Sequence, residues 1–89
     1  MEGRKIVFSD GTEIADGECG FSNGVLWCYN VGTNFLQVAT QFSDPAKTAS
    51  ITFVYGEMQD VYEGYTDVIA VMTQFDGTLK VALRKGANE

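Results

Sequence analysis

Apolar and polar positions follow a helical period in one stretch of this chain, residues 33–42. The apolar side chains of this stretch recur at helical spacing, and they are Phe35, Leu36, Val38, Ala39 and Phe42. The spacing predicts an amphipathic helix over residues 34–43, with Asn34 as its N-cap and Asp44 before Pro45 as its end. Because so short a helix is unstable alone, we expect a sheet to cover the whole apolar stripe.

The rest of the chain alternates between apolar and polar residues, as half-buried strands do. Three Asp-Gly or Asn-Gly pairs interrupt the alternation, at residues 10–11, 23–24 and 76–77. Such pairs between β-rich runs predict hairpins with two-residue turns. This turn would pair Lys5 with Asp16 in the first hairpin. In the last hairpin it would pair Met72 with Val81 and direct Met72 and Ala70 at the helix.

The order of these elements is strands, helix, strands. Residues 49–55 add a further buried strand after the helix, whereas residues 56–64 break the alternation. We therefore expect one α+β domain over residues 1–89, with no linker. Its antiparallel β-sheet would have five or six strands and carry one helix on one face.

Cys19 and Cys28 become direct cross-strand neighbours if the middle hairpin has a two-residue turn. Counting from the turn places them at a non-hydrogen-bonded pair, where Cα atoms approach to about 4.5 Å, near the lower end of the disulfide range. A disulfide is thus geometrically allowed. The alternative is a pair of reduced core thiols that pack as small hydrophobic side chains.

The residue types present exclude most catalytic and metal chemistry. The chain has two cysteines and no histidine, the commonest general base and metal ligand. It also has no glycine-rich phosphate motif and no calcium-loop spacing of aspartates. We therefore expect a protein that is not an enzyme and that needs no cofactor or metal.

Twelve acidic residues against six basic ones give a net charge of −6, and no Lys or Arg occurs between Lys47 and Lys80. Direct binding to nucleic acid is disfavoured, because that affinity comes mostly from basic side chains on phosphates. A basic protein partner fits the charge better. No apolar run approaches the ~18 residues of a membrane span and no signal-type start is present, so we expect an intracellular protein without membrane association.

One stretch, residues 55–67, combines tyrosines and a methionine with carboxylates. Its candidate partner-binding residues are Tyr55, Glu57, Met58, Asp60, Tyr62, Glu63, Tyr65 and Asp67. Tyrosine and methionine are enriched in interface cores, and a row of carboxylates can imitate phosphates toward a basic groove. Glu57, Asp60 and Glu63 would form such a row if residues 57–63 make a helical turn. The alternative is a solvated acidic connection whose tyrosines pack on the sheet edge.

A second candidate surface is the face of the middle hairpin that carries Val25, Trp27 and Tyr29. The predicted register places Trp27 opposite Gly20, so the indole ring can lie over the glycine. If this face is exposed, Trp27 and Tyr29 form an aromatic patch for a partner. The alternative is that both rings pack in the core or under a loop.

Three sequence segments of the chain resemble segments of a known group of proteins. They are I-V-F-S-D-G-T-E near the start, F-S-D-P-A-K-T-A-S-I-T-F after the helix, and V-Y-E-G-Y-T before the last hairpin. The chain resembles small prophage-encoded proteins of gut bacteria, most of which have no assigned function. The resemblance implies a phage origin, a location in the cytoplasm of the bacterial host or in the virion, and no catalytic residues.

Two functional hypotheses follow from these patterns. The first is a non-enzymatic protein-interaction module of phage or prophage origin, which binds a protein partner or forms a homo-oligomer through its sheet edges. The second is an inhibitor of a host defence nuclease, as anti-CRISPR proteins are, whose carboxylates in residues 55–67 occupy the nucleic-acid groove.

Overall fold

The computed structural model describes residues 3–86, which form an α+β fold of eight strands and two short helices. The strands are β1 (Arg4–Val7), β2 (Glu13–Ala15), β3 (Glu18–Ser22), β4 (Val25–Tyr29), β5 (Ser50–Tyr55), β6 (Met58–Glu63), β7 (Asp67–Thr73) and β8 (Leu79–Arg84). The helices are α1 (Phe35–Phe42) and α2 (Pro45–Thr48). Among these residues, neither helix has the length and hydropathy needed to cross a membrane.

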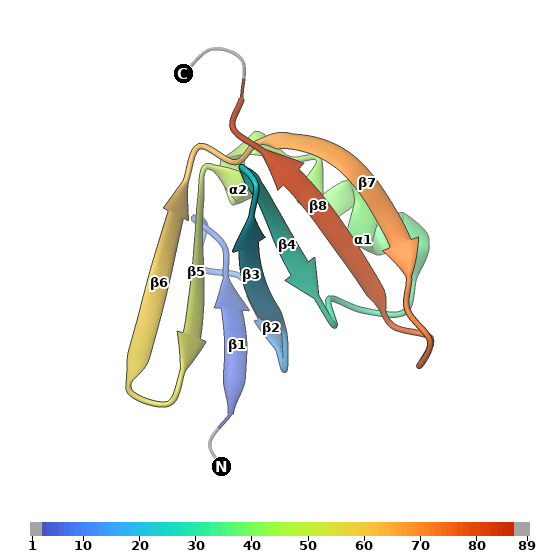
Figure 1. Ribbon diagram of the computed structural model, residues 1–89, viewed down its shortest axis with the longest axis horizontal. Coiled ribbons are helices and arrows are strands. Elements are labelled where there is room, and N and C mark those ends of the chain that lie inside the picture. Colours follow the sequence, from blue (N-terminus) through green and yellow to red (C-terminus); the bar gives the residue numbers. More distant parts are fainter. Residues whose placement is uncertain (1–2, 87–89) are drawn as a thin grey trace.

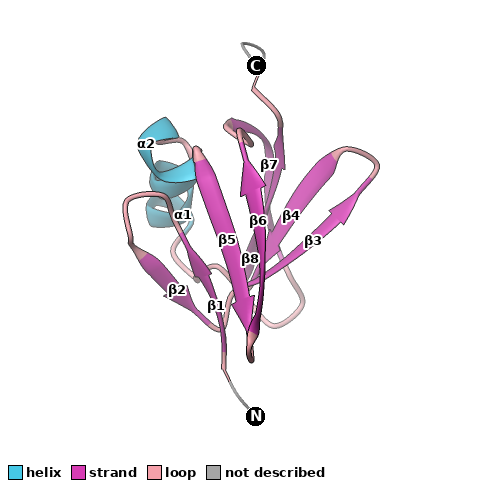
Figure 2. Cartoon of the chain, turned by 90° about the vertical axis from the view of Figure 1, so that its left-hand side faces the viewer, coloured by secondary structure: helices cyan, strands magenta, loops and turns pink. Residues whose placement is uncertain are grey.

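The strands form two antiparallel sheets of four strands each (Figure 1). The first sheet has the order β2-β1-β5-β6 and the second has the order β3-β4-β8-β7. Each sheet joins a hairpin that precedes the helices to a hairpin that follows them, and both helices lie on one side of the molecule (Figure 2). The structure thus corrects the expected single sheet of five or six strands, because residues 58–63 form an additional strand and the hairpins divide between two layers.

The middle hairpin has the predicted register, in which Cys19 pairs with Cys28. Asn23 and Gly24 both have positive φ, of 55° and 79°. A type I′ turn requires positive φ at both central positions, and asparagine tolerates this conformation better than most residues. The prediction of a two-residue turn at Asn23-Gly24 is confirmed.

The first Asp-Gly hairpin has a three-residue loop instead. The Phe8 amide donates to the Thr12 carbonyl at 2.8 Å, and Gly11 has a φ of 90°. The Asp10 carboxylate accepts the Thr12 N–H at 2.9 Å, and Asp10 is not among the residues with positive φ. This geometry is a type I turn followed by a glycine in the left-handed region, which is the usual three-residue hairpin loop.

The last hairpin repeats this loop. The backbone N–H of Gln74 donates to the backbone carbonyl of Thr78 at 2.7 Å, and Gly77 has a φ of 90°. The Asp76 carboxylate accepts the Thr78 N–H at 3.0 Å, as Asp10 does in the first hairpin with its own threonine. The Asp-Gly-Thr motif therefore forms the same three-residue loop in the first and the last hairpin.

The longer loops move both registers by one residue from the prediction. The observed pairs are Lys5 with Ala15 and Met72 with Lys80, in place of Lys5 with Asp16 and Met72 with Val81. A shift of one residue moves the side chains of one strand to the other face relative to its partner strand, and here β7 is reversed while Leu79, Val81 and Leu83 of β8 stay buried. Met72 and Ala70, which we expected to face the helix, consequently lie on the outer face of the second sheet.

Helix α1 begins and ends close to the predicted residues. The Asn34 side chain accepts the Gln37 N–H at 3.0 Å and so caps the first turn. A second helix, α2, follows directly, and there the Asp44 carboxylate accepts the Ala46 N–H at 3.0 Å. Asp44 therefore separates two helices, because Pro45 after it suits the first position of a new helix.

Only part of the predicted apolar stripe of α1 is covered. Val38 and Phe42 are buried, whereas Phe35 is 58% exposed and Leu36 is 75% exposed. A helix turns about 100° per residue, so Leu36 points about 160° away from Val38. Phe35 lies in the first turn, at the free end of the helix. The expectation that a sheet covers the whole stripe was therefore wrong.

The core lies between the two sheets and α1. Phe8, from the loop after β1, meets Phe42 of α1 edge to face, with the ring centroids 5.1 Å apart. The other buried core residues are Ile6, Cys19, Leu26, Cys28, Val31, Val38, Ile51, Phe53, Leu79, Val81 and Leu83. This packing leaves the outer faces of both sheets and one side of α1 at the surface.

Candidate functional site

The outer face of the second sheet carries the predicted aromatic pair. Trp27 and Tyr29 are half-buried there, and their rings are nearly parallel with centroids 6.4 Å apart. The Lys80 ammonium lies 5.1 Å from the Trp27 centroid and 5.9 Å from the Tyr29 centroid, within cation–π range. Tyr29, rather than Trp27, is the ring that approaches Gly20, at 3.6 Å from the position of a β-carbon. The pair is thus neither in the core nor fully exposed.

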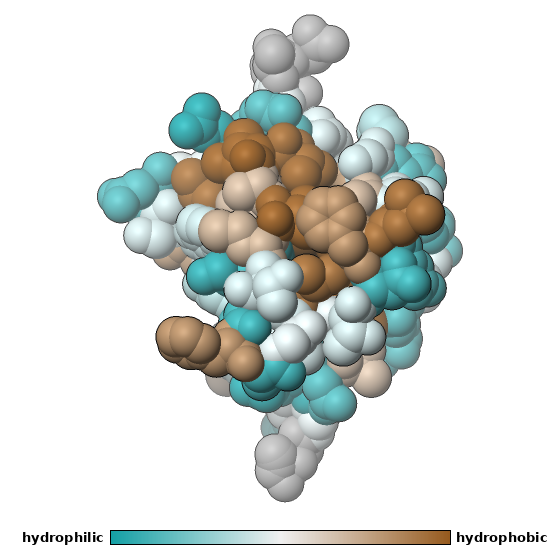
Figure 3. Space-filling view, turned by 90° about the vertical axis from the view of Figure 1, so that its right-hand side faces the viewer, coloured by the Kyte–Doolittle hydropathy of each residue, from teal (hydrophilic) through white to brown (hydrophobic). Residues whose placement is uncertain are grey.

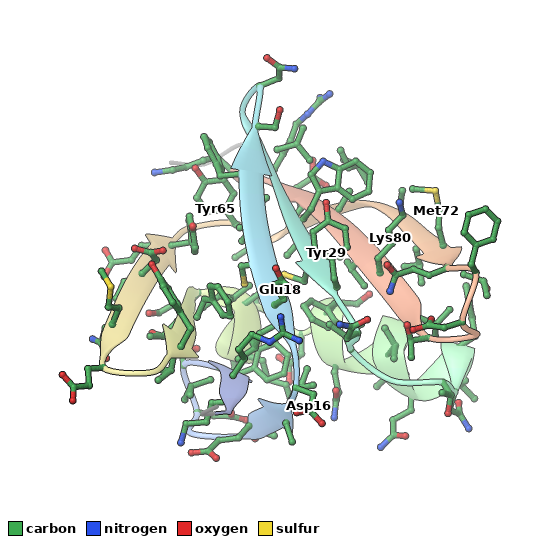
Figure 4. The ribbon with its side chains drawn as sticks, turned by 60° about the horizontal axis from the view of Figure 1, so that its bottom comes forward. Asp16, Glu18, Tyr29, Tyr65, Met72 and Lys80 are labelled. Atoms are coloured by element: carbon green, nitrogen blue, oxygen red, sulfur yellow. The ribbon has the colours of Figure 1, made fainter. Side chains whose placement is uncertain are left out.

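Met72 and the loop between β7 and β8 extend this aromatic face. Figure 4 shows Tyr29, Lys80 and Met72 on the same side of the second sheet. A shallow pocket of about 540 Å³ adjoins them and is lined by Thr73, Gln74, Phe75, Asp76 and Lys80. Phe75 is fully exposed at the tip of the loop.

Two polar side chains of this pocket, Gln74 and Asp76, have hydrogen-bond partners within the protein. The Gln74 amide donates to Asn30 Oδ1 at 3.1 Å and to Thr78 Oγ1 at 2.8 Å. The Thr78 hydroxyl and N–H donate to Asp76, and these bonds lower the pKa of the Asp76 carboxyl. What the pocket exposes most is the Phe75 ring, so it suits apolar contact better than catalysis.

Residues 56–63 form a turn and a strand instead of the helical turn that a row of carboxylates requires. Gly56, with a φ of 61°, and Glu57 make a two-residue turn that pairs Tyr55 with Met58. Glycine at the first central position is typical of a type II′ turn. Strand β6 then forms one edge of the first sheet. Sequence periodicity missed it because an exposed edge strand need not alternate.

The carboxylates of this stretch consequently do not share one face. Asp60 pairs with the buried Phe53 and so lies on the inward side of β6, whereas Glu63 pairs with Ser50 on the outward side. Asp67 lies on β7, in the other sheet. A strand alternates its side chains every residue, so a spacing of three cannot align them.

The tyrosines of this stretch contact other aromatic or acidic groups. The Tyr55 hydroxyl donates to the Asp60 carboxylate at 3.1 Å, which raises the pKa of Tyr55. Tyr62 and Tyr65 pack with Phe21 of β3, with centroid distances of 6.2 Å and 5.8 Å, and burial is the main cause of a raised pKa of Tyr62. These contacts bridge the edge strands β6 and β3 and leave Phe21 half-exposed at the rim.

Cys19 and Cys28 are buried free thiols in the predicted cross-strand pairing. Their sulfur atoms lie within contact distance, and this contact together with burial raises the pKa of Cys28. The thiolate is the reactive form of cysteine, so a raised pKa makes Cys28 a poor nucleophile. The pair belongs to the core rather than to a reactive site.

An exposed apolar area lies over α1 and β7, where no site was expected from the sequence. We call it the α1–β7 face, and its defining residues are Phe35, Leu36, Ile69 and Met72. Figure 3 shows apolar residues gathered over this part of the molecule. Ile69 is 41% exposed at a bulge in β7, and Met72 is 38% exposed. The one usable signal in the sequence was the angular position of Leu36, opposite Val38 on the helix.

The α1–β7 face is built from two segments without charge. Residues 19–43 and 68–75 contain no Asp, Glu, Lys or Arg. Asp67 and Asp76 are the first charged residues on either side of the second segment. In a chain of net charge −6, these two segments supply exposed apolar side chains, and the cross-strand partner of Met72 is the basic Lys80.

A second hollow, of about 510 Å³, lies against the first sheet and carries charge. It is lined by Gly3, Arg4, Lys5, Glu13, Ala15, Asp16, Val54 and Gly56. Arg4 pairs with Glu18 at 3.0 Å and Lys5 pairs with Glu13 at 3.1 Å. Both ion pairs are about half exposed, so they contribute little stability and neutralise much of the charge there.

Within residues 3–86, no three His, Cys, Asp or Glu side chains come together as they would to hold a metal ion. No protein-family model, curated protein or solved structure matches the chain.

Proposed function

We propose that this protein is a non-enzymatic protein-interaction module of phage or prophage origin, which binds through the α1–β7 face. The observation that carries the proposal is the exposure of four large apolar side chains on two segments that carry no charge, with Leu36 the most exposed of the four at 75%. Burying apolar surface contributes about 25 cal/mol per Å². Interface cores are enriched in Phe and Met and depleted in charge.

A folded protein suits this face better than a small molecule does. Small ligands bind in concave sites that enclose most of their surface, whereas helix α1 and strand β7 present a broad face. Trp27 and Tyr29 lie beyond Lys80, which pairs with Met72, and they supply further aromatic contact area. The phage origin rests on the sequence resemblance, and with it goes a location in the bacterial host cytoplasm or in the virion.

Photo-cross-linking in the bacterial host tests the proposal. A photoreactive phenylalanine analogue replaces Leu36 in one variant and Met58 in a matched control. Met58 is 61% exposed on β6, in the other sheet. We expect a covalent protein adduct from position 36 and little from position 58. No adduct at position 36, or equal labelling at both positions, contradicts the proposal.

The second candidate is an inhibitor of a host defence nuclease that imitates nucleic acid, as anti-CRISPR proteins do. Exposed carboxylates in and beside β6 favour the inhibitor hypothesis. Glu57, Asp60 and Glu63 are all exposed, and none of them forms an ion pair within residues 3–86. Their placement on different sides of the strand weakens it, because a phosphate row needs charges along one line.

Salt and charge dependence distinguish the two candidates. Mimicry predicts binding that weakens steeply with salt and is lost when Glu57→Gln, Asp60→Asn and Glu63→Gln are combined. The Asp60→Asn change keeps an acceptor for the Tyr55 hydroxyl, so the fold is retained. Binding that survives this triple variant but is lost in Leu36→Glu contradicts mimicry and supports the interaction module.

A further inference from the structure

We infer that the occupant of the α1–β7 face is a second copy of this chain, so that the protein forms a two-fold symmetric dimer. The inference rests on the proposed function, because it names the partner of the same surface. It is carried by the charge distribution of the molecule, by the position of β7 at a sheet edge, and by the neutral polar residues around the apolar area.

Charge decides where two identical acidic chains can meet. Each copy carries a net charge of −6, so contact through most of the surface brings like charges together. Like charges set against each other across an interface cost several kcal/mol. The α1–β7 face brings no carboxylates together, because residues 19–43 and 68–75 carry no charge and the cross-strand partner of Met72, Lys80, is basic.

The other exposed apolar side chains do not offer the same possibility. Met58 is 61% exposed and Val61 is 49% exposed, but both lie on β6 among Glu57, Asp60 and Glu63. A second copy placed there would meet the same carboxylates across the two-fold axis. Strand β6 therefore disfavours self-association, as charged edge strands commonly do.

The α1–β7 face has the features of a self-complementary surface. A two-fold interface sets one patch against its own copy, so each group must be able to face itself or a near neighbour. Leu36 and Ile69 can pack against apolar partners of the same kind. Neutral residues that can donate and accept hydrogen bonds are exposed on the same two segments, and these are Thr33, Asn34, Gln37, Thr40 and Thr73.

The position of β7 adds a second reason. It is an edge strand of the second sheet, and its outer side has no strand neighbour among the described residues. Edge strands are liable to pair with other chains unless they are covered or charged, and residues 68–73 of β7 have no charge. The irregular register between Val68 and Ala70 pushes Ile69 out of the ladder, so we expect side-chain packing with α1 rather than one continuous sheet.

Sedimentation equilibrium over a wide range of protein concentration tests the inference. We expect the wild-type chain to approach about twice its mass of 9.7 kDa, with little dependence on salt. The Leu36→Glu variant should raise the dissociation constant by roughly 30-fold or more, the size of a hot-spot loss. Met58→Glu is the matched control, because it adds the same charge at an exposed apolar site and should leave the dimer intact.

Circular dichroism and thermal unfolding of both variants establish that each still folds, which is expected because both side chains are exposed. A wild-type chain that stays monomeric at all concentrations overturns the inference, as does a dimer that Leu36→Glu leaves unchanged. A cross-linked adduct at position 36 whose mass is not twice that of the chain overturns the inference of a dimer. It leaves the proposal of a protein-interaction module standing. No adduct at that position overturns both.

Discussion

The sulfur atoms of Cys19 and Cys28 lie 4.0 Å apart on directly opposed residues of β3 and β4. We expect the oxidant diamide to join them in an intramolecular disulfide, in which the two thiols give up two hydrogen atoms to the N=N bond of diamide. Chain-entropy estimates for so short a loop give a gain in stability of about 2 to 3 kcal/mol.

Intact-mass spectrometry checks this prediction by the loss of two hydrogen masses, and urea unfolding measures the gain in stability. Because the contact with Cys19 and burial raise the pKa of Cys28, the reaction should be slow at neutral pH and faster in mild denaturant. Cys19→Ala is the control and should show neither change. Formation of a disulfide between chains instead would contradict the geometry.

Asp10 and Lys47 form an ion pair at 2.7 Å that fastens the first loop to α2. The bond from Lys47, with further bonds from Thr12, lowers the pKa of Asp10 from 3.8 to about 2. A folded-state pKa below the unfolded value stabilises the fold above pH 3.8, and this stabilisation is lost as the pH falls toward about 2. Asp10→Asn should therefore lower stability at pH 7 and flatten its decline between pH 4 and 2.

Urea midpoints across this pH range provide the measurement. Asp76→Asn is the matched control, because Asp76 occupies the same place in the same loop but receives its bonds from Thr78. An amide oxygen can still accept those bonds, so its effect at pH 7 should be smaller. Equal effects of the two substitutions would show that the ion pair contributes nothing beyond the turn.

Gly17 lies against the buried Ile6, and a β-carbon built on Gly17 would lie 2.8 Å from its Cδ1 and 2.9 Å from its Cγ1. Gly17→Ala should therefore destabilise the fold by about 1 to 3 kcal/mol, as overpacking of a core usually does. Gly20→Ala is the control, since the nearest atom there is 3.6 Å away, an ordinary contact. Thermal unfolding of both variants checks the difference, and equal melting temperatures would contradict the close approach.

Asn34 caps α1 by accepting the Gln37 N–H at 3.0 Å. Asn34→Ala should cost about 1 kcal/mol, because it leaves an amide of the first turn without its acceptor. Gln37→Ala keeps the backbone donor and places a good helix former at an exposed position, so we expect little change. Urea unfolding of the two variants tests this. A loss in Gln37→Ala as large as that in Asn34→Ala would assign the effect to the Gln37 side chain.

The hairpins show how far local sequence determines register. Asn23-Gly24 met the prediction because both residues can take positive φ, as a type I′ turn demands. Asp10 and Asp76 keep negative φ and bond the threonine two residues on, which adds one residue to each loop. The expectation of a two-residue turn therefore gives the correct register for the Asn-Gly hairpin. For the two Asp-Gly hairpins it gives a register that is wrong by one residue.

The candidate site was less accessible to sequence reasoning than the fold. Residues 55–67 stood out by composition, yet the structure distributes them over β6, its turn and β7, on both sides of an edge strand. Phe35 and Leu36 were expected in the core because they belong to a helical stripe of five apolar residues. That stripe is wider than the part of the eight-residue helix α1 that the core covers, which is Val38 and Phe42. Exposure depends on what lies opposite a residue, and spacing alone does not report that.

The α+β class, the position and cap of α1, the Asn-Gly hairpin and the opposition of Cys19 and Cys28 could all be predicted from the amino-acid sequence. Each of these depends on backbone preferences and hydrogen bonds between residues close in the chain. The division of the hairpins between two sheets, and the burial of Val38 and Phe42 but not of Leu36, became visible in the folded chain alone. These outcomes depend on non-local packing, in which faces from distant segments compete for one small core.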